Sequence, residues 1–493
     1  MKYIGIDLGT TAVKLLLMNE KGEILNIVSK EYPLYFLHTN WAEQNPDDWW
    51  NAVVCGVKEL VSDVDVSTVA GIGCGGQMHG LVVLDKNDRV IRPAILWNDG
   101  RTQKEVEYLN NVIGAKRLSD LTANIAFAGF TAPKLLWMKN NEPELFDSID
   151  KIMLPKDYIN YRLTGVHSTD YSDASGMLLL NVKNKRYSKE MLDICGVREK
   201  QMPRLFESYD IISTLKSEIA DQLGLKRTVR IVAGAGDNAA AAIGTGTIGD
   251  GKCNISLGTS GTVFVSSNSF CVDKNNALHS FCHADGNYHL MGCMLSAASC
   301  NKWWQNNIVG TDDHDSEQAE ISDDMLGKNE VYFLPYLMGE RSPINDTNAR
   351  GVFVGMTLGT SRADMLQAVL EGVAFAIRDS FEVVRSLGIN IGQSTVCGGG
   401  AKSELWKKIL SNVLGIRLDT VMTEQGPGLG GAILAAVGCG EFDSVEDACG
   451  KLIDISVGEE PDDALVKQYD KKYSKFVKLY PSLKCVFGDL ATE

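Results

Sequence analysis

The sequence predicts an α/β protein of two similar domains, each built on a mixed sheet flanked by helices. Its 493 residues exceed what one hydrophobic core normally supports, so two domains of about 200 to 250 residues are expected. Two nearly identical turns lie half a chain apart, DLGTT at residues 7–11 and SLGTSG at residues 256–261. Hairpin-linked strand patterns alternate with helical patterns, which favours mixed rather than purely parallel sheets.

The first half of the chain supplies the pattern of the first domain. Apolar and β-branched runs predict its strands, and amphipathic spacing predicts its helices. The expected strands are residues 3–6, 13–17, 24–30, 69–73, 81–84 and 228–233, and the expected helices are 46–60, 99–111, 132–140 and 238–243. A glycine-rich segment follows at residues 244–251. It marks the boundary between predicted domains of residues 1–248 and 249–493.

The second half repeats this order of elements. A hairpin is expected around Gly258, and further strands at residues 279–284 and 288–291. A long helix at residues 363–387, a strand ending in Gly398 and a helix beginning at Ser403 follow. Residues 465–483 form an amphipathic helical pattern that would pack on either domain, including back on the N-terminal one.

Composition narrows the class of protein. The net charge is −15, and lysine and arginine form no cluster, so nucleic acid and anionic membranes are not expected as the main partners. No apolar run approaches the roughly 18 residues of a membrane span, and the N-terminus begins as a strand, which predicts a cytoplasmic protein. The twelve cysteines form no C-x-x-C pair and suit reduced thiols.

The two matched turns are candidate phosphate-binding loops. Glycine lets backbone N–H groups approach an oxyanion, and the neighbouring hydroxyls add donors. One such turn is also an ordinary hairpin turn, but two that face one another would hold a polyphosphate between the domains. The predicted nucleotide-binding residues of these turns are Gly9, Thr10, Thr11, Gly258, Thr259, Ser260 and Gly261.

Two aspartates near these turns are candidate catalytic residues. Asp237 follows a strand and begins a helix, where open α/β sheets place ligands and where the helix dipole helps keep a carboxylate ionised. Capping the helix is its alternative role, but Gly234 and Gly236 leave space before the carboxylate that capping does not require. Asp7 stands where the second turn has Ser256. It would hold a hydrated Mg²⁺, with an Asx turn as the alternative.

Other glycine-rich segments are less specific. Residues 246–253 depart from a P-loop because Cys253 stands where Ser or Thr would meet Mg²⁺. Residues 234–239 match a dinucleotide fingerprint, except that Asp237 would oppose a pyrophosphate. Residues 398–403 run from a strand into a helix and suit a nucleotide. The glycines of residues 426–431 suit either the same site or tight helix packing.

Together these motifs resemble the FGGY carbohydrate kinases over nearly the whole chain. The matching segments also include GFTAPKLLW at residues 129–137, GVFVG at 351–355 and LEG at 370–372. The resemblance implies the actin-like, ribonuclease-H-like two-domain fold, with ATP and sugar in the interdomain cleft. It implies that Asp237 is the general base, that Asp7 assists Mg²⁺–ATP, and that Gly399, Gly400 and Ala401 lie near the adenosine.

Further motifs resemble the branch of this family that phosphorylates D-xylulose on O5. They are GQMHG at residues 76–80, AILWNDGR at 94–101, LPKDY at 154–158 and HSFCH at 279–283. Glycerol kinases carry an Arg-Glu pair where this chain has Met78 and His79, which argues for a larger ketose. His79 in its glycine-flanked loop also suits a structural role. The sugar-binding residues that the resemblance implies are Gln77, Met78, His79, Trp97, Asp99 and Asn238.

Several alternatives stay open. The alternative acceptors for a kinase are ribulose, gluconate and glycerol. The alternative classes of protein are an NAD-dependent dehydrogenase and a non-catalytic sugar-binding protein. His279, Cys282, His283 and His289 lack the spacing of a zinc site and alternate along two strand patterns, so structural roles are expected for them. A homodimer is compatible with the resemblance.

Overall fold

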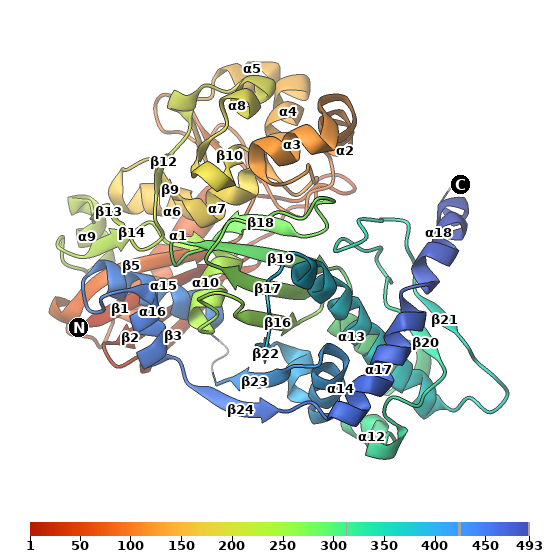
Figure 1. Cartoon of the computed structure of the whole chain (residues 1–493). Coiled ribbons are helices and arrows are strands. Elements are labelled where there is room, and N and C mark those ends of the chain that lie inside the picture. The colour runs from red at the N-terminus through yellow and green to blue at the C-terminus, as the bar shows by residue number, and fades with distance from the viewer. Residues whose placement is uncertain (312, 423–424, 492–493) are drawn as a thin grey trace.

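The computed structural model describes residues 1–311, 313–422 and 425–491, and its order of elements confirms the predicted α/β class. Two seven-stranded mixed sheets form the centres of two domains (Figure 1). In both sheets a hairpin lies beside parallel neighbours, so the duplicated turns reflect a duplicated sheet.

The first sheet is built around the hairpin of residues 2–19. Its first strand pairs antiparallel with the second strand of the hairpin on one side and parallel with residues 69–76 on the other. In spatial order the strands are β13 (Ile211–Thr214), β14 (Arg230–Val232), β5 (Val69–Gly76), β1 (Lys2–Leu8), β2 (Ala12–Asn19) and β3 (Ile24–Glu31), and β15 (Ala235–Gly236) pairs with the end of β5. The predicted strands 3–6, 13–17, 24–30 and 69–73 are therefore confirmed.

The second sheet repeats this arrangement around the hairpin of residues 253–267. Two parallel strands follow its first strand, and an antiparallel strand closes that edge. In spatial order the strands are β18 (His279–Cys282), β19 (Tyr288–Met294), β17 (Gly261–Ser267), β16 (Cys253–Leu257), β22 (Gln393–Cys397), β23 (Arg417–Val421) and β24 (Ile455–Glu459).

Capping side chains explain where several helices begin. The Asn45 side chain accepts a hydrogen bond from the Asp47 amide at the start of α1 (Pro46–Leu60), a helix predicted with the same bounds. Ser361 and Asp364 form a capping box at the start of α13 (Arg362–Ser386). The other helices of the two sheet domains are α9 (Ser217–Leu223), α10 (Asp237–Gly244), α11 (Ala298–Trp303), α12 (His314–Ala319) and α14 (Glu404–Leu414).

The chain between β5 and β13 forms an inserted lobe, residues 77–210, at the top of Figure 1. The helix predicted over residues 99–111 begins later there, at Gln103, because residues 99–102 form a turn around Asp99. A π-helical segment continues it over Tyr108–Gly114. The lobe core also includes Phe264 and Phe281 from the second domain. Its helices are α2 (Gln103–Glu107), α3 (Ala115–Thr122), α4 (Thr131–Asn141), α5 (Pro143–Asp147), α6 (Pro155–Thr164), α7 (Tyr171–Ala174) and α8 (Lys189–Cys195).

Short strand pairs complete the fold. Four involve residues between β3 and β13, and one projects from the second domain. The pairs are β4 (Glu43–Gln44) with β7 (Ala94–Ile95), β6 (Val82–Leu84) with β8 (Lys151–Met153), β9 (Ser168–Asp170) with β12 (Arg204–Phe206), β10 (Leu180–Asn181) with β11 (Arg186–Tyr187), and β20 (Tyr332–Leu334) with β21 (Val352–Val354).

After residue 425 the chain returns to the first domain, which differs from the predicted contiguous division at residue 248. Helices α15 (Gly426–Gly438) and α16 (Val445–Leu452) share a core with Tyr3 and with residues of α10 (Figure 1). Glycines allow this return, because a Cβ added to Gly430 would stand 1.8 Å from the Ala240 carbonyl oxygen. The glycine-rich start of α15 thus serves tight helix packing, and its first two residues, Gly426 and Pro427, also line the pocket between the domains.

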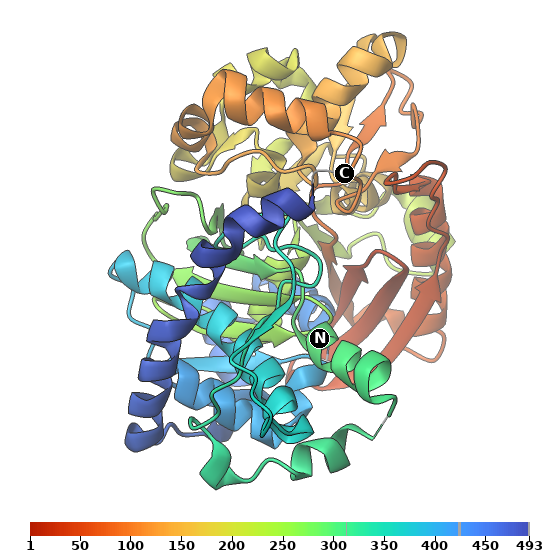
Figure 2. The same ribbon diagram turned by 90° about the vertical axis from the view of Figure 1, so that its right-hand side faces the viewer.

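The C-terminal segment packs on the second domain, not back on the first. It forms two helices, α17 (Asp463–Phe476) and α18 (Leu479–Leu490), instead of the one helix predicted at residues 465–483. Their side chains Tyr469, Phe476 and Phe487 belong to the core of the second domain. In Figure 2 both helices run along that domain.

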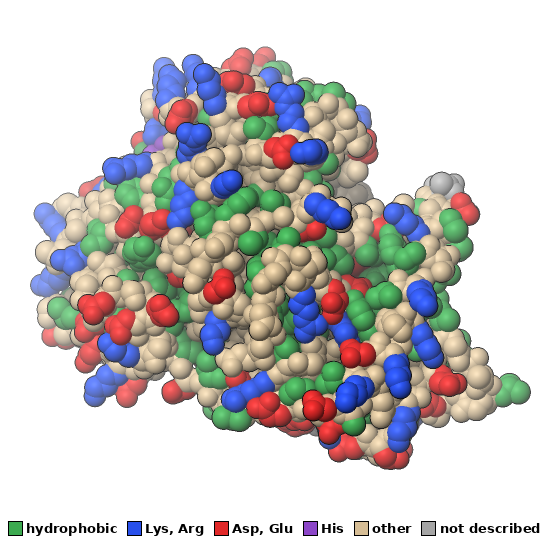
Figure 3. All heavy atoms as spheres, viewed as in Figure 1, with side chains coloured by type: hydrophobic (Ala, Val, Ile, Leu, Met, Phe, Trp, Pro, Cys, Tyr) green, Lys and Arg blue, Asp and Glu red, His purple; other side chains and the backbone are tan. Residues whose placement is uncertain are grey.

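The surface carries charges of both signs. On the face shown in Figure 3, lysine and arginine side chains are interspersed with aspartate and glutamate. Within the residues that the structure describes, no helix is long and apolar enough to cross a membrane.

We expect Gly430→Ala to lower the free energy of unfolding by about 3 kcal/mol, because its new methyl group meets the Ala240 backbone. Gly450→Ala is a matched control, since its Cβ on α16 would meet nothing within 4 Å and alanine favours a helix. Urea unfolding of both variants gives the comparison. Equal stabilities would contradict the packing of α15 described above.

Candidate active site

A cleft of about 920 Å³ lies between the two domains. The first domain contributes α10 to its lining, and the second contributes the β16–β17 hairpin and the loop after β22. Of the predicted residues, Asn238, Gly258, Ser260, Gly399 and Ala401 line this cleft. Its lining also includes Lys402 and Pro427, from the glycine-rich segments 398–403 and 426–431, and residues that the sequence did not single out, namely Thr245, Asn254, Thr262 and Thr420.

The carbonyl groups of the first turn point into the protein. The Tyr32 hydroxyl donates to the Gly9 carbonyl, and the Gln44 side chain donates to the Thr10 carbonyl at 2.6 Å. The Tyr32 amide donates to the Thr11 carbonyl at 3.1 Å. Because the N–H of a trans peptide points opposite to its C=O, these contacts turn the amides of residues 10 and 11 to the other side. The turn thus presents donors that suit a phosphate.

The second turn is held in the same way by α11. The Ala298 amide donates to the Gly258 carbonyl at 2.9 Å, and the Ala297 amide donates to the Thr259 carbonyl at 3.0 Å. Thr259 itself is exposed at the tip of the hairpin. Gly261 is buried behind it, where a Cβ would stand 3.0 Å from the Ala297 side chain.

The glycines after β22 differ in what they do. Gly398 has φ +91°, and a Cβ there would stand 2.7 Å from the Leu257 backbone. Gly400 is buried against Leu257 and Trp406, so it supports the loop instead of lining the cleft. Gly399 faces open space, as an adenosine contact would require.

Asp237 begins α10 beside the cleft. Gly236 is the capping residue, so Asp237 does not serve as the N-cap. Its Oδ1 accepts hydrogen bonds from the Asn238 amide at 2.7 Å and from the Asn238 side chain at 2.9 Å. Burial raises the pKa of Asp237 to about 7, and the negative charge of Asp7 adds to the rise while these hydrogen bonds oppose it. A carboxylate of this pKa is matched to accept a proton near neutral pH.

Asp7 shares the electrostatic environment of Asp237. Burial raises the pKa of Asp7 to about 6, and only Lys14 opposes the rise. Among the described residues no group donates a hydrogen bond to its carboxylate, so the Asx-turn alternative is not formed. Asp7 and Asp237 come from different elements, and they lie close enough for the charge of Asp7 to raise the pKa of Asp237.

The loop of residues 77–80 packs against the strand that leads to Asp237. A Cβ on Gly236 would stand 2.9 Å from the Met78 side chain, so this glycine lets the loop approach. His79 Nδ1 lies 2.9 Å from the Gly176 carbonyl oxygen, which only accepts, so Nδ1 carries the proton and Nε2 stays an acceptor. Burial lowers the pKa of His79 to about 3, and its ring lies 4.7 Å from that of Phe130.

A buried lysine holds this loop. Lys134 donates to the His79 carbonyl at 2.9 Å and to the Gly129 carbonyl at 2.7 Å, and Thr131 donates to the His79 carbonyl at 3.1 Å. All three residues outside the loop belong to the GFTAPK segment, which therefore fixes the loop of residues 77–80. The sequence indicated this segment only through the family resemblance, because its contacts lie about fifty positions away along the chain.

Gln77 and Trp97 connect this loop to the first turn. Gln77 is buried and donates to the Gln44 side chain at 3.1 Å, while its own Oε1 has no partner among the described residues. Trp97 is 45% exposed, and its Nε1 donates to the Thr10 hydroxyl at 3.0 Å. Trp97 thus offers an apolar face next to the turn, and its role in sugar binding stays a prediction.

Asp99 does not lie as predicted for a sugar-binding residue. The buried carboxylate of Asp99 accepts from the Ala42 amide at 2.6 Å and forms an ion pair with Arg101 at 2.7 Å. Arg101 in turn stacks 3.6 Å from the Trp41 ring centroid. These contacts occupy Asp99, which supports the loop internally. Asn238 lines the cleft and donates to Asp237 at 2.9 Å, and its role in binding the sugar stays a prediction.

The histidines after β17 form an aromatic wall. His289 stacks on Phe264 with ring centroids 4.1 Å apart, and His283 Nε2 lies 3.0 Å from the Thr247 carbonyl oxygen. Arg341, which the sequence did not single out, places its guanidinium 5.2 Å from the ring centroid of Phe127. It brings a positive charge from the second domain to this wall.

The duplicated sheets, the paired hairpin turns and the cleft between them define the actin-like class of ATP-binding proteins. The chain belongs to the FGGY family of carbohydrate kinases. The N-terminal domain model of that family matches residues 2–244, and its C-terminal domain model matches residues 253–439.

Individual relatives support the same assignment. The chain is 40% identical to a xylulose kinase from Escherichia coli (strain K12), over 98% of this chain and 99% of that protein. It is similar to the crystal structure of a xyloylose kinase from Brucella ovis, with a TM-score of 0.94 and 38% identity over 99% of this chain and 100% of the other. A gluconate kinase from Lactobacillus acidophilus also has a TM-score of 0.94, at 28% identity over 99% of both chains.

In the free protein we expect Asp237 to titrate near pH 7 and Asp7 near pH 6, as followed by ¹³C NMR of labelled carboxyl groups. Asp7→Asn should lower the pKa of Asp237, because it removes a negative charge that favours the protonated form. Asp120→Asn at an exposed site should leave it unchanged. An Asp237 that titrates near the ordinary value of about 4 would contradict the assigned electrostatics.

Proposed function

We propose that this protein transfers the γ-phosphoryl group of ATP to the O5 hydroxyl of D-xylulose, giving D-xylulose 5-phosphate and ADP. One observation carries the proposal. Asp237, a carboxylate with a pKa raised to about 7, stands between the loop of Met78 and His79 and the cleft that Asn238 lines. The similarity to xylulose kinases favours D-xylulose among the sugars such a site would accept.

The residues of the site suggest how the transfer proceeds. Asp237 accepts the proton of the O5 hydroxyl as the bond from O5 to the γ-phosphorus forms. The bond from the γ-phosphorus to the β–γ bridging oxygen breaks, and ADP leaves with that electron pair. His79 Nε2, a neutral acceptor, would bind another sugar hydroxyl. The amides of the two turns would bind the phosphates, and closing the cleft would exclude water that otherwise hydrolyses ATP.

Mg²⁺ fits the donors at this site. Within the described residues no cluster of three His, Cys, Asp or Glu side chains suits a metal ion, whereas Asp7 offers a hard oxygen donor. A cation held through one or two carboxylates, water and substrate phosphates is the usual form of Mg²⁺ binding. Asp7 would hold the ion through water, and the bound ion would neutralise phosphate charge. The homodimer and the cytoplasmic location both stay predictions.

Coupled measurement of ADP release over a panel of acceptors tests this function. We expect D-xylulose to give the highest kcat/KM, and glycerol the lowest, because Met78 and His79 replace the pair suited to a small triol. Ribulose and gluconate are the informative comparisons, since a gluconate kinase shares the fold. Preference for any of these over D-xylulose would reject the assigned substrate, and thermal stabilisation by NAD instead of ATP would reject a kinase.

Asp237→Asn should lower kcat by about 100-fold or more, the usual effect of losing a positioned base. The amide keeps the shape of the side chain but does not accept the proton. Calorimetry should show ATP binding little changed, because Asp237 is not needed to hold the nucleotide. Sugar phosphorylation at nearly the wild-type rate would exclude Asp237 as the base.

A further inference from the structure

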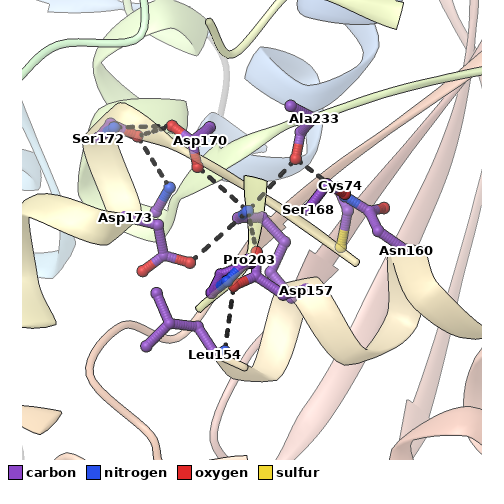
Figure 4. A network of polar contacts seen from close by, with 12 residues as sticks. Cys74, Leu154, Asp157, Asn160, Ser168, Asp170, Ser172, Asp173, Pro203 and Ala233 are labelled. Carbon is purple, nitrogen blue, oxygen red and sulfur yellow. Dashed lines mark hydrogen bonds and ion pairs between the residues drawn. The ribbon is translucent and has the colours of Figure 1, made fainter. Parts of the chain in front are cut away.

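A buried charge network lies under the strand that leads to Asp237. Lys156 on α6 places its ammonium 2.8 Å from Asp157, 3.1 Å from Asp170 and 3.7 Å from Asp173, and all four side chains are fully buried. Figure 4 shows the three carboxylates and the Ala233 carbonyl around one nitrogen atom, which is the ammonium nitrogen of Lys156. The mechanism above uses none of these groups.

Both carboxylate oxygen atoms of Asp170 are held by contacts within and beside this network. Although burial opposes the charge of Lys156, its three acidic neighbours raise the pKa of that ammonium. Burial raises the pKa of Asp173 well above its usual range, which favours a neutral Asp173. Asp170 Oδ1 faces Lys156, while its Oδ2 accepts hydrogen bonds from the Ser172 amide, the Ser172 hydroxyl and the Ser208 hydroxyl.

Ser172 connects this network to Asp237. Its hydroxyl donates to Asp170 Oδ2 at 2.5 Å, and the Gly236 amide donates to the same hydroxyl oxygen at 3.1 Å. A serine hydroxyl has one proton, so when Asp170 accepts it an oxygen lone pair is left for Gly236. Asp170 thereby sets the direction of the hydrogen bond that holds the residue immediately before Asp237.

Other contacts hold the same segment from several sides. Lys156 and Asn160 donate to the Ala233 carbonyl at 3.3 Å and 2.9 Å. On the side of the first sheet, Gly234 has φ +73°, and a Cβ there would stand 2.0 Å from the Cys74 carbonyl oxygen. Residues 233–236 are therefore clamped between the sheet and the network, which fixes where the Asp237 carboxylate points.

We propose that Ser172, oriented by Asp170, is a positioning residue that holds Asp237 in line with the hydroxyl it deprotonates. The proposal rests on the proposed function, since it concerns the base of that reaction. The physical reason is that a displacement of about 1 Å in a reacting group is enough to lower a rate by about 100-fold. Loss of Ser172 Oγ leaves the Gly236 amide without its partner and frees that displacement.

Ser172→Ala and Ser208→Ala form a matched pair for the test. Both remove one buried hydroxyl that donates to Asp170 Oδ2, and only Ser172 also accepts from Gly236. We expect Ser172→Ala to lower kcat by about 10- to 100-fold with KM for ATP within about twofold, and Ser208→Ala to keep kcat within about twofold. Melting temperatures of both variants show whether their losses of stability match.

Equal kcat values for the two variants, or falls in kcat that follow the melting temperature, would overturn the proposal. If Ser172→Ala does not fold, Asp170→Asn decides, because an amide donating to Ser172 would turn the hydroxyl proton toward Gly236 and should also lower kcat. Hydrogen exchange of the Gly236 amide, faster in Ser172→Ala than in Ser208→Ala, tests the clamp without turnover. Slow exchange in both variants would reject the clamp, whereas a wild-type protein that phosphorylates no sugar would reject only the proposed function.

Discussion

The close backbone approach of α15 to the first domain is the constraint on which the site depends. A Cβ added to Gly5 would lie 1.9 Å from the Gly428 carbonyl oxygen, and a Cβ added to Gly73 would lie 2.1 Å from the Gly431 carbonyl oxygen. A third such contact, at 2.0 Å, joins Gly244 of α10 to Gly426. Only glycine permits these contacts, and they bring the second half of the chain against β1, β5 and α10. Because α10 begins with Asp237 and α15 begins at the cleft, this packing holds the base and part of the nucleotide wall in one rigid unit.

The raised pKa values of Asp7 and Asp237 determine what chemistry this rigid unit supports. Asp7 and Asp237 both have raised pKa values because they are buried near one another without a basic partner at hydrogen-bonding distance. Two other buried acids of the first domain are paired, Asp99 with Arg101 and Asp157 with Lys156. Their ion pairs support the fold, whereas Asp7 and Asp237 have no such partner. A region that keeps unpaired negative charge is suited to receive a proton and to bind a cation that accompanies phosphate.

Residues of the site were predictable where their role followed from local backbone geometry. The two hairpin turns and the strand-to-helix position of Asp237 are of this kind, and the structure has both turns at hairpin tips. Asp99 shows the limit, because its sequence motif did not reveal that Arg101 folds back on it. Lys134, Ser172 and Arg341 escaped notice for a related reason. Their contacts are with segments distant along the chain, and no spacing rule connects such partners.

The sequence by itself determined the class of fold, the duplicated turns, the candidate base and the family, because each is expressed in neighbouring residues whose spacing reflects backbone hydrogen bonding. Only the tertiary structure decided that residues 426–452 rejoin the first domain, that α17 and α18 stay with the second, and that Asp99 is an internal ion pair. These outcomes depend on which surfaces reach each other at atomic distance. Close packing and burial, which set both the helix contacts and the pKa values of Asp7 and Asp237, are properties of the assembled chain.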